Sequence, residues 1–216
     1  MGVLLLQDKT AVETLRDIER TLAESTTFEC TFNCDGENQL KNRDLVLNSG
    51  VVLMKNQNLY SFMSKDHDFY CVFNREGSVS HKANDLRKSV LRPPELRKAV
   101  ASNFIRLGGC LSQLGIEEGL TDKGEFLPKV RTIQIMDLAR EPNSGDLGAL
   151  SYSLPISGKE EPAIVTLWFN LKSLLPVKRR IELIGKEERL RVTEEYSCTI
   201  NENIREERFT LQEEKK

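Results

Sequence analysis

Residues 26–34 are the stretch that most constrains what this chain can fold into. Apolar side chains occupy every second position there: Phe28, Cys30, Phe32 and Cys34. The positions between them carry polar side chains. Because successive side chains on a β-strand point to opposite faces, this spacing predicts a strand with one apolar face and one solvated face.

The segment just before this strand shows the helical period instead. Its apolar residues recur at three- and four-residue steps: Val12, Leu15, Ile18 and Leu22. Thr10 and Glu13 fit a capping box at the helix start. We therefore expect an amphipathic helix over residues 10–24 that leads into the strand and lies across the Phe/Cys face of a sheet.

Composition limits the class of protein and its partners. A chain of 216 residues is long enough for one sizeable domain, and we expect a single domain over residues 1–216 with a charged tail at 212–216. Lysine and arginine total 31 against 33 acidic residues, so no net field recruits nucleic acid. No stretch reaches the roughly 18 apolar residues of a membrane-spanning helix.

The N-terminus bears on the cellular compartment. Residues 3–6 form an apolar run before the helical pattern begins, with no basic segment in front of it. We interpret residues 1–9 as the remnant of a removed export signal, which would place the protein in the periplasm. A flexible hydrophobic N-terminus of a cytosolic protein is the alternative.

The five cysteines do not form a metal or redox motif. They are Cys30, Cys34, Cys71, Cys110 and Cys198, with no C-x-x-C pair. Cys30 and Cys34 share a strand face, but they lie roughly 13 Å apart in an extended chain, beyond disulfide reach. We interpret most of the five as small buried hydrophobes, and a long-range disulfide stays open.

The rest of the chain alternates short extended segments with turn residues. Residues 35–38 are expected to form a turn, and a second amphipathic helix is expected from Pro93 to Gly115. Strands are expected at 39–47, 51–55, 59–64, 68–74, 78–83, 130–138, 147–155, 163–171, 177–184 and 189–200, with a short final strand at 204–211. The fold class is α+β and mainly β: a strongly curved, antiparallel, unclosed half-barrel of about ten strands, with helices over its mouth.

Motifs for catalysis or metal binding are not found. Asp66, His67 and Asp68 are interpreted as a solvated turn, because alternate strand residues cannot converge on one metal. His81 is interpreted as a surface strand residue. The basic residues at 87–98 and the run Lys178–Arg180 are interpreted as solvated faces, with lipid headgroups or an acidic partner as the alternative.

Several segments together resemble the LolA-like superfamily of periplasmic lipoprotein carriers. Residues 14–34 resemble the entry helix and first strand of that family. Residues 50–55 with 58–62, residues 69–79, residues 175–179 and residues 208–211 look like its later hairpins, a proline-led strand and its closing strand. Asn56 and Gln57 stand where the carrier proper has an Arg-Pro pair. The resemblance implies a LolA-like half-barrel with a helical lid, whose apolar cavity accepts acyl chains in the periplasm after the signal peptide is removed.

The function expected on these grounds is lipid binding without catalysis. The predicted lipid-binding residues are Phe28, Phe32, Leu53, Phe62, Phe73, Leu96, Val100, Phe104 and Trp168, and a packed core is the competing interpretation of them. We expect no enzyme activity, no cofactor and no metal. The expected partner is a lipid or an acylated lipoprotein, and an envelope protein partner stays open. A protein-interaction or envelope-stress-sensing module that binds a peptide and no lipid is the alternative function.

Overall fold

The computed structural model describes residues 10–209 except 42–43, 46, 48, 57–58, 65–68, 75–76, 83–84, 90–131, 136–144 and 157–158. One α-helix, eleven strands and a 3-10 helix occupy these residues. They are α1 (Ala11–Glu24), β1 (Thr27–Gln39), β2 (Gly50–Lys55), β3 (Leu59–Ser64), β4 (Phe69–Asn74), β5 (Gly77–Lys82), β6 (Asp85–Ser89), β7 (Thr132–Ile135), β8 (Leu147–Leu154), β9 (Ala163–Asn170), β10 (Pro176–Ile184), β11 (Arg189–Ile200) and η2 (Glu206–Phe209).

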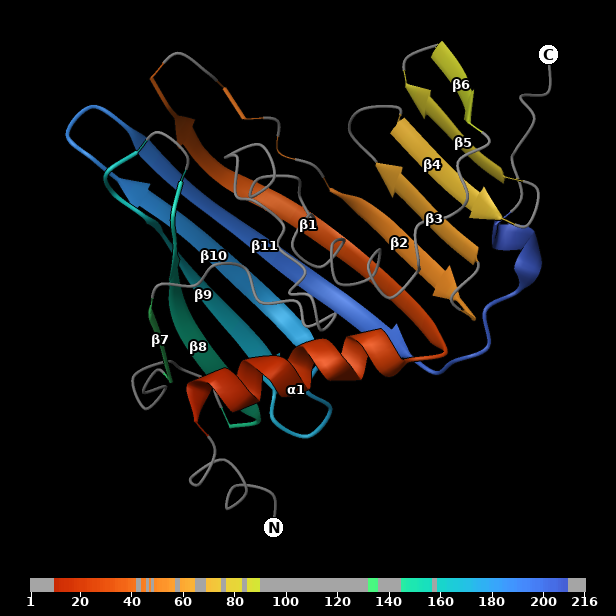
Figure 1. Cartoon of the computed structure of the whole chain (residues 1–216), viewed down its shortest axis with the longest axis horizontal. Coiled ribbons are helices and arrows are strands. Elements are labelled where there is room, and N and C mark those ends of the chain that lie inside the picture. Colours follow the sequence, from red (N-terminus) through yellow and green to blue (C-terminus); the bar gives the residue numbers. More distant parts are fainter. Residues whose placement is uncertain are drawn as a thin grey trace.

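The eleven strands form one sheet in the order β6-β5-β4-β3-β2-β1-β11-β10-β9-β8-β7. Every strand pair in it is antiparallel. The first and last of the described strands, β1 and β11, lie side by side in the middle (Figure 1). The edge strands β6 and β7 do not pair in the described part of the chain, so the predicted mainly β, antiparallel, unclosed sheet is confirmed.

The predicted number of strands differs from the structure, and the predicted helical lid lies only partly within the described residues. The described residues form eleven strands in place of about ten. The helix expected from Pro93 to Gly115, the export remnant at 1–9 and the tail at 212–216 lie outside the described residues. Of the helices expected over the sheet, α1 is the one that the structure describes.

Helix α1 has the predicted cap and the predicted buried side. The Thr10 hydroxyl accepts a hydrogen bond from the Glu13 backbone N–H at 3.2 Å, and the Thr10 N–H donates to the Glu13 carboxylate at 2.8 Å. Leu15, Ile18 and Leu22 are all buried against the sheet. Because the cap satisfies backbone donors and the stripe removes apolar surface from water, both local and tertiary terms favour the helix.

The sheet has two distinct faces, which alternate along each strand. We call the side on which α1 packs the helix face. It carries Phe28, Cys30 and Phe32 of β1 together with Val52 of β2 and Tyr196 of β11, because these positions are aligned in the register. The opposite side is called the outer face. In Figure 1, α1 crosses the helix face over β8, β9, β10 and β11, and strands β2 to β6 continue the sheet beyond the helix.

The turn predicted at residues 35–38 is wrong. These residues continue β1, which pairs with β11 as far as Gln39 opposite Arg189. Gly36 allows this, because its φ of +152° is open to glycine and a Cβ there would lie 2.0 Å from the Arg191 carbonyl oxygen. A glycine between polar residues indicates a turn locally, but here it permits close approach of two strands.

The final strand predicted at 204–211 is also wrong. The chain forms the short helix η2 there and packs on the outer face. Ile204 and Phe209 are buried against Leu53 and Leu59, and the Arg208 guanidinium binds the Glu29 carboxylate through two bonds of 2.8 Å. This C-terminal segment therefore covers the outer face of β2 and β3.

A substitution of Gly36 tests the close approach of β1 to β11. We expect Gly36→Ala to lower the free energy of unfolding by roughly 2–4 kcal/mol, because the methyl group meets a backbone carbonyl and φ becomes unfavourable. Gly145→Ala is the matched control, because a Cβ at Gly145 meets no atom within 4 Å. Urea denaturation measures both variants, and equal midpoints for the two would contradict this account of β1.

Candidate functional site

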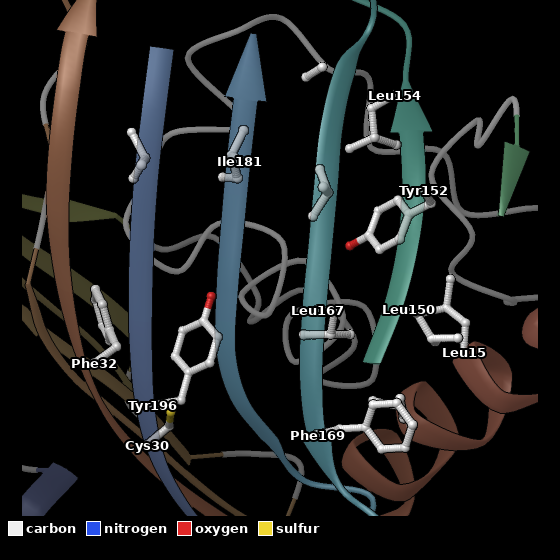
Figure 2. Close-up of a cluster of buried hydrophobic side chains, with 14 of the residues drawn as sticks. Leu15, Cys30, Phe32, Leu150, Tyr152, Leu154, Leu167, Phe169, Ile181 and Tyr196 are labelled. Carbon is white, nitrogen blue, oxygen red and sulfur yellow. The ribbon is translucent and has the colours of Figure 1, made fainter. Parts of the chain in front are cut away.

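A continuous cluster of buried apolar side chains lies between α1 and the helix face of the sheet. Its buried side chains come from α1 and from strands β1, β2, β8, β9, β10 and β11. Figure 2 shows part of it, with Phe32 and Tyr196 beside each other, and with Leu150 and Phe169 next to the helix that carries Leu15. This surface is the candidate binding surface.

Two of the predicted lipid-binding residues lie on this surface. Phe28 is 3% exposed and Phe32 is 0% exposed, and both pack within the core cluster. Phe62 lies in β3 opposite Val52, and Phe73 lies in β4 opposite Tyr60. Leu96, Val100 and Phe104, the candidates expected on the second helix, lie outside the described residues. Lipid binding by these residues stays a prediction.

The prediction that Leu53 and Trp168 share this inward surface is wrong. The register places Leu53 opposite Glu29 and Trp168 opposite Lys178, and all four positions belong to the outer face. Leu53 packs on the C-terminal segment. Both residues stand in strands whose odd and even positions are both apolar, so the sequence pattern does not show which face of the sheet each residue occupies.

Trp168 has a cationic environment on the outer face. The Lys178 ammonium and the Arg180 guanidinium lie 5.4 and 5.3 Å from its ring centroid. The indole is nevertheless buried. Cations at this distance are attracted to the face of an indole ring, and their aliphatic stems exclude water from it. The basic run Lys178–Arg180 is therefore not one solvated face, because its middle residue points to the other side of the sheet.

That middle residue, Arg179, forms a buried polar cluster on the helix face with Glu194 and Tyr196. The side chains of Arg179 and Glu194 are both 0% exposed. The Arg179 Nε donates a hydrogen bond to Glu194 Oε2, and the Tyr196 hydroxyl donates to the same oxygen at 2.5 Å. Arg179 faces Glu194 directly across the β10–β11 pair, so the register of the sheet brings the two charges together.

Burial and the neighbouring charges shift the pKa values of the side chains in and beside the cluster. Burial alone would lower the pKa of Arg179, but the adjacent Glu194 carboxylate raises that pKa on balance. Burial raises the pKa of Tyr196 well above its ordinary range and that of the neighbouring Tyr152 to about 12. At neutral pH the Arg179 guanidinium is therefore charged and the phenols of Tyr152 and Tyr196 are neutral.

One acceptor of the cluster is left open. Glu194 Oε1 is buried, and no donor reaches it in the part of the chain that the structure describes. A buried carboxylate oxygen without a donor is costly, because the carboxylate has lost its hydration at that position. The arrangement suits a hydrogen-bond donor such as a hydroxyl, an ammonium or a water molecule.

The acidic and histidine motifs noted in the sequence give no metal site among the residues that the structure describes. Asp66, His67 and Asp68 lie outside the described residues, and His81 lies within β5. Across the described ranges, no group of three potential ligands is placed to hold a metal ion. Of the helices described, none is both long and apolar enough to cross a membrane.

Comparisons with known proteins give distant likenesses to solved structures and no match in sequence. No family model matches the chain, and no curated protein matches its sequence. Among solved structures, it is similar to a LolA superfamily protein from Nitrosomonas europaea, with 12% sequence identity, a TM-score of 0.31, and coverage of 94% of this chain and 98% of that one. At this identity and TM-score, the likeness carries no argument for the function.

Breaking the buried ion pair tests its role in stability. Arg179→Met leaves Glu194 charged and uncompensated, and we expect a loss of about 3–5 kcal/mol in the free energy of unfolding. Arg179→Met combined with Glu194→Leu should recover most of that loss. The matched control is Arg180→Met on the outer face, with an expected loss of about 1 kcal/mol. Chemical denaturation of the parent, Arg179→Met, Glu194→Leu and the double variant gives the cycle, with Arg180→Met measured beside them, and a purely additive double variant would count against direct coupling.

The raised pKa of Tyr152 predicts an alkaline loss of stability. Above pH 10 the unfolded state releases the Tyr152 proton, whereas the folded state holds it until about pH 12. The folded state then binds more protons, so stability falls as pH rises through this window, by about 1.4 kcal/mol per pH unit. Tyr152→Phe should show a shallower decline between pH 10 and 12 in urea titrations. Parallel declines for the two proteins would rule out a raised pKa at this residue.

Proposed function

We propose that the chain binds acyl chains, of a lipid or of an acylated lipoprotein, between α1 and the helix face, without catalysis. The observation that carries the proposal is the continuous apolar side of an unclosed sheet, crossed by the amphipathic helix α1 in the part of the chain that the structure describes. Burial of each acyl methylene contributes about 0.8 kcal/mol, so roughly ten of them supply micromolar affinity before ordering costs. No reacting group is needed for this.

The path of the guest follows from the position of α1. The helix lies over β8 to β11, so the acyl chain lies beside it on the helix face of β1 and β2. Phe28, Phe32, Val52 and Met54 belong to that part of the face. An unclosed, strongly curved LolA-like half-barrel with a helical lid is the architecture that this proposal assumes.

The polar cluster offers a hydrogen-bond acceptor to the polar end of the bound lipid. Glu194 Oε1 lies in the same apolar surface and lacks a donor among the described residues. A glycerol hydroxyl or an ammonium of a lipid headgroup would supply that donor and gain a charge-assisted hydrogen bond. The cargo favoured by this chemistry is an amphiphile with a donor next to its acyl chains.

We place this activity in the bacterial periplasm. Acyl chains need a protein cover wherever they leave one membrane and cross an aqueous compartment to another. An exported carrier with an acylated lipoprotein or an envelope protein as partner fits that need, after removal of a signal peptide.

A second function is favoured by one observation. Phe28 and Phe32 are fully packed against neighbouring side chains. A filled interior suits a protein-interaction or envelope-stress-sensing module, in which the sheet is a scaffold for binding a partner peptide and carries no lipid.

Extraction of the purified chain separates the two functions. We expect organic extraction followed by mass spectrometry to recover phospholipid or acylated peptide from protein purified out of the periplasm. A reproducibly lipid-free protein that also fails to bind a fluorescent fatty-acid analogue would favour the interaction module. Tryptophan quenching is not the appropriate signal, because Trp168 lies on the outer face.

Two neighbouring residues of β2 provide a test of the face that binds. Val52 lies on the helix face and Val51 lies on the outer face of the same strand. Val52→Thr places a hydroxyl group against the guest, and we expect roughly tenfold weaker binding of the fatty-acid analogue. Val51→Thr should bind as the parent does. Thermal unfolding of both variants controls for stability, and equal affinities would place the guest elsewhere.

A further inference from the structure

Two cysteines face each other across the central strand pair. Cys30 of β1 is directly opposite Cys198 of β11, and both side chains contribute to the helix face. Both are free thiols in this structure. The chain positions are far apart, so only the pairing of β1 with β11 brings them together.

The hydrogen-bond pattern of these strands fixes the geometry of the pair. The Asn201 N–H donates to the Thr27 carbonyl at 2.9 Å, so Thr27 and Asn201 are a hydrogen-bonded pair. Hydrogen-bonded and non-hydrogen-bonded pairs alternate along an antiparallel ladder, which makes Cys30 and Cys198 a non-hydrogen-bonded pair. In such pairs the Cα atoms lie about 4.5 Å apart and the side chains approach closely, within the range that a disulfide spans.

The contact between the two thiols is specific. Cys198 is the main cause that raises the pKa of the Cys30 thiol, with burial second, which agrees with the direct pairing of the two residues in the register. Cys34 shares the helix face, but it lies opposite Glu194. The register therefore selects Cys198 as the partner of Cys30.

We propose that Cys30 and Cys198 are a modification site, where a reversible disulfide joins the first and last strands of the sheet. Cys198 is half-buried and Cys30 is fully buried, so the Cys198 thiolate is the first to react. It attacks a low-molecular-weight disulfide such as oxidised glutathione and releases one reduced glutathione. The Cys30 thiolate then attacks the Cys198 sulfur and releases the second. Two protein thiols are oxidised, one glutathione disulfide is reduced to two thiols, and the protons balance.

The location of the bond determines its effect. It closes a loop that contains most of the chain, and such loops restrict the unfolded state most. The Cα separation of a non-hydrogen-bonded pair is at the short end of the disulfide range, which favours a bond that reductants can open. This inference is independent of the proposed lipid binding, because it uses only the register and the two thiols.

Peptide mapping of the oxidised full-length chain tests the proposal. A Cys71→Ser/Cys110→Ser background leaves three thiols, and equilibration with oxidised and reduced glutathione should yield a protein lighter by about 2 Da than the reduced form. Proteolysis without reductant should release one linked pair of peptides, containing Cys30 and Cys198. The oxidised form should melt about 5–15 °C higher than the reduced form, and excess dithiothreitol should reverse the shift.

Two further variants show whether Cys30 pairs with Cys198 or with Cys34. Cys34→Ser in the same background should keep the linked peptides and the melting shift, whereas Cys198→Ser should lose both. Linkage of Cys30 to Cys34, or stable mixed disulfides at both Cys30 and Cys198, would overturn the proposal. If Cys198→Ser does not fold, peptide mapping of the parent background still decides, because the absence of a Cys30–Cys198 peptide after complete oxidation refutes it.

Discussion

The pairing of β1 with β11 is the interaction on which the rest of this structure depends. It aligns Phe28 with Ile200 at one end and Gln39 with Arg189 at the other, and it joins the β2–β6 side of the sheet to the β7–β10 side. The same alignment brings Cys30 to Cys198 and places Phe32 beside Tyr196. A slip by one residue would move each side chain of β11 to the opposite face, so the apolar surface under α1 exists only in this register.

The sequence predicts those elements whose local pattern and tertiary environment agree. The capping box at Thr10, the stripe of α1 and the alternation in β1 are all found where the residues place them. Agreement fails where local pattern is ambiguous. Leu53 and Trp168 stand among apolar residues on both parities, so only the pairing partners decide which face each one takes.

The polar cluster was beyond local prediction for a different reason. Arg179 lies between Lys178 and Arg180, and three consecutive basic residues ordinarily indicate a solvated surface. On a strand, however, these three residues alternate between the two faces of the sheet, so Arg179 points to the opposite side from Lys178 and Arg180. The burial of Arg179 is tolerable only because Glu194 is opposite it on β11. The clue in the sequence is parity: Arg179 shares a face with Ile181 and Leu183, and Glu194 shares one with Val192 and Tyr196.

The position of β1 and β11 also has a consequence during synthesis. The ribosome produces β11 about 150 residues after β1, which at 5–20 residues per second takes roughly 8–30 s. Throughout that interval the Phe/Cys side of β1 has no partner strand on its β11 edge, and the nascent chain presents an aggregation-prone edge. The strand order therefore leaves this edge of β1 open until β11 has been synthesised.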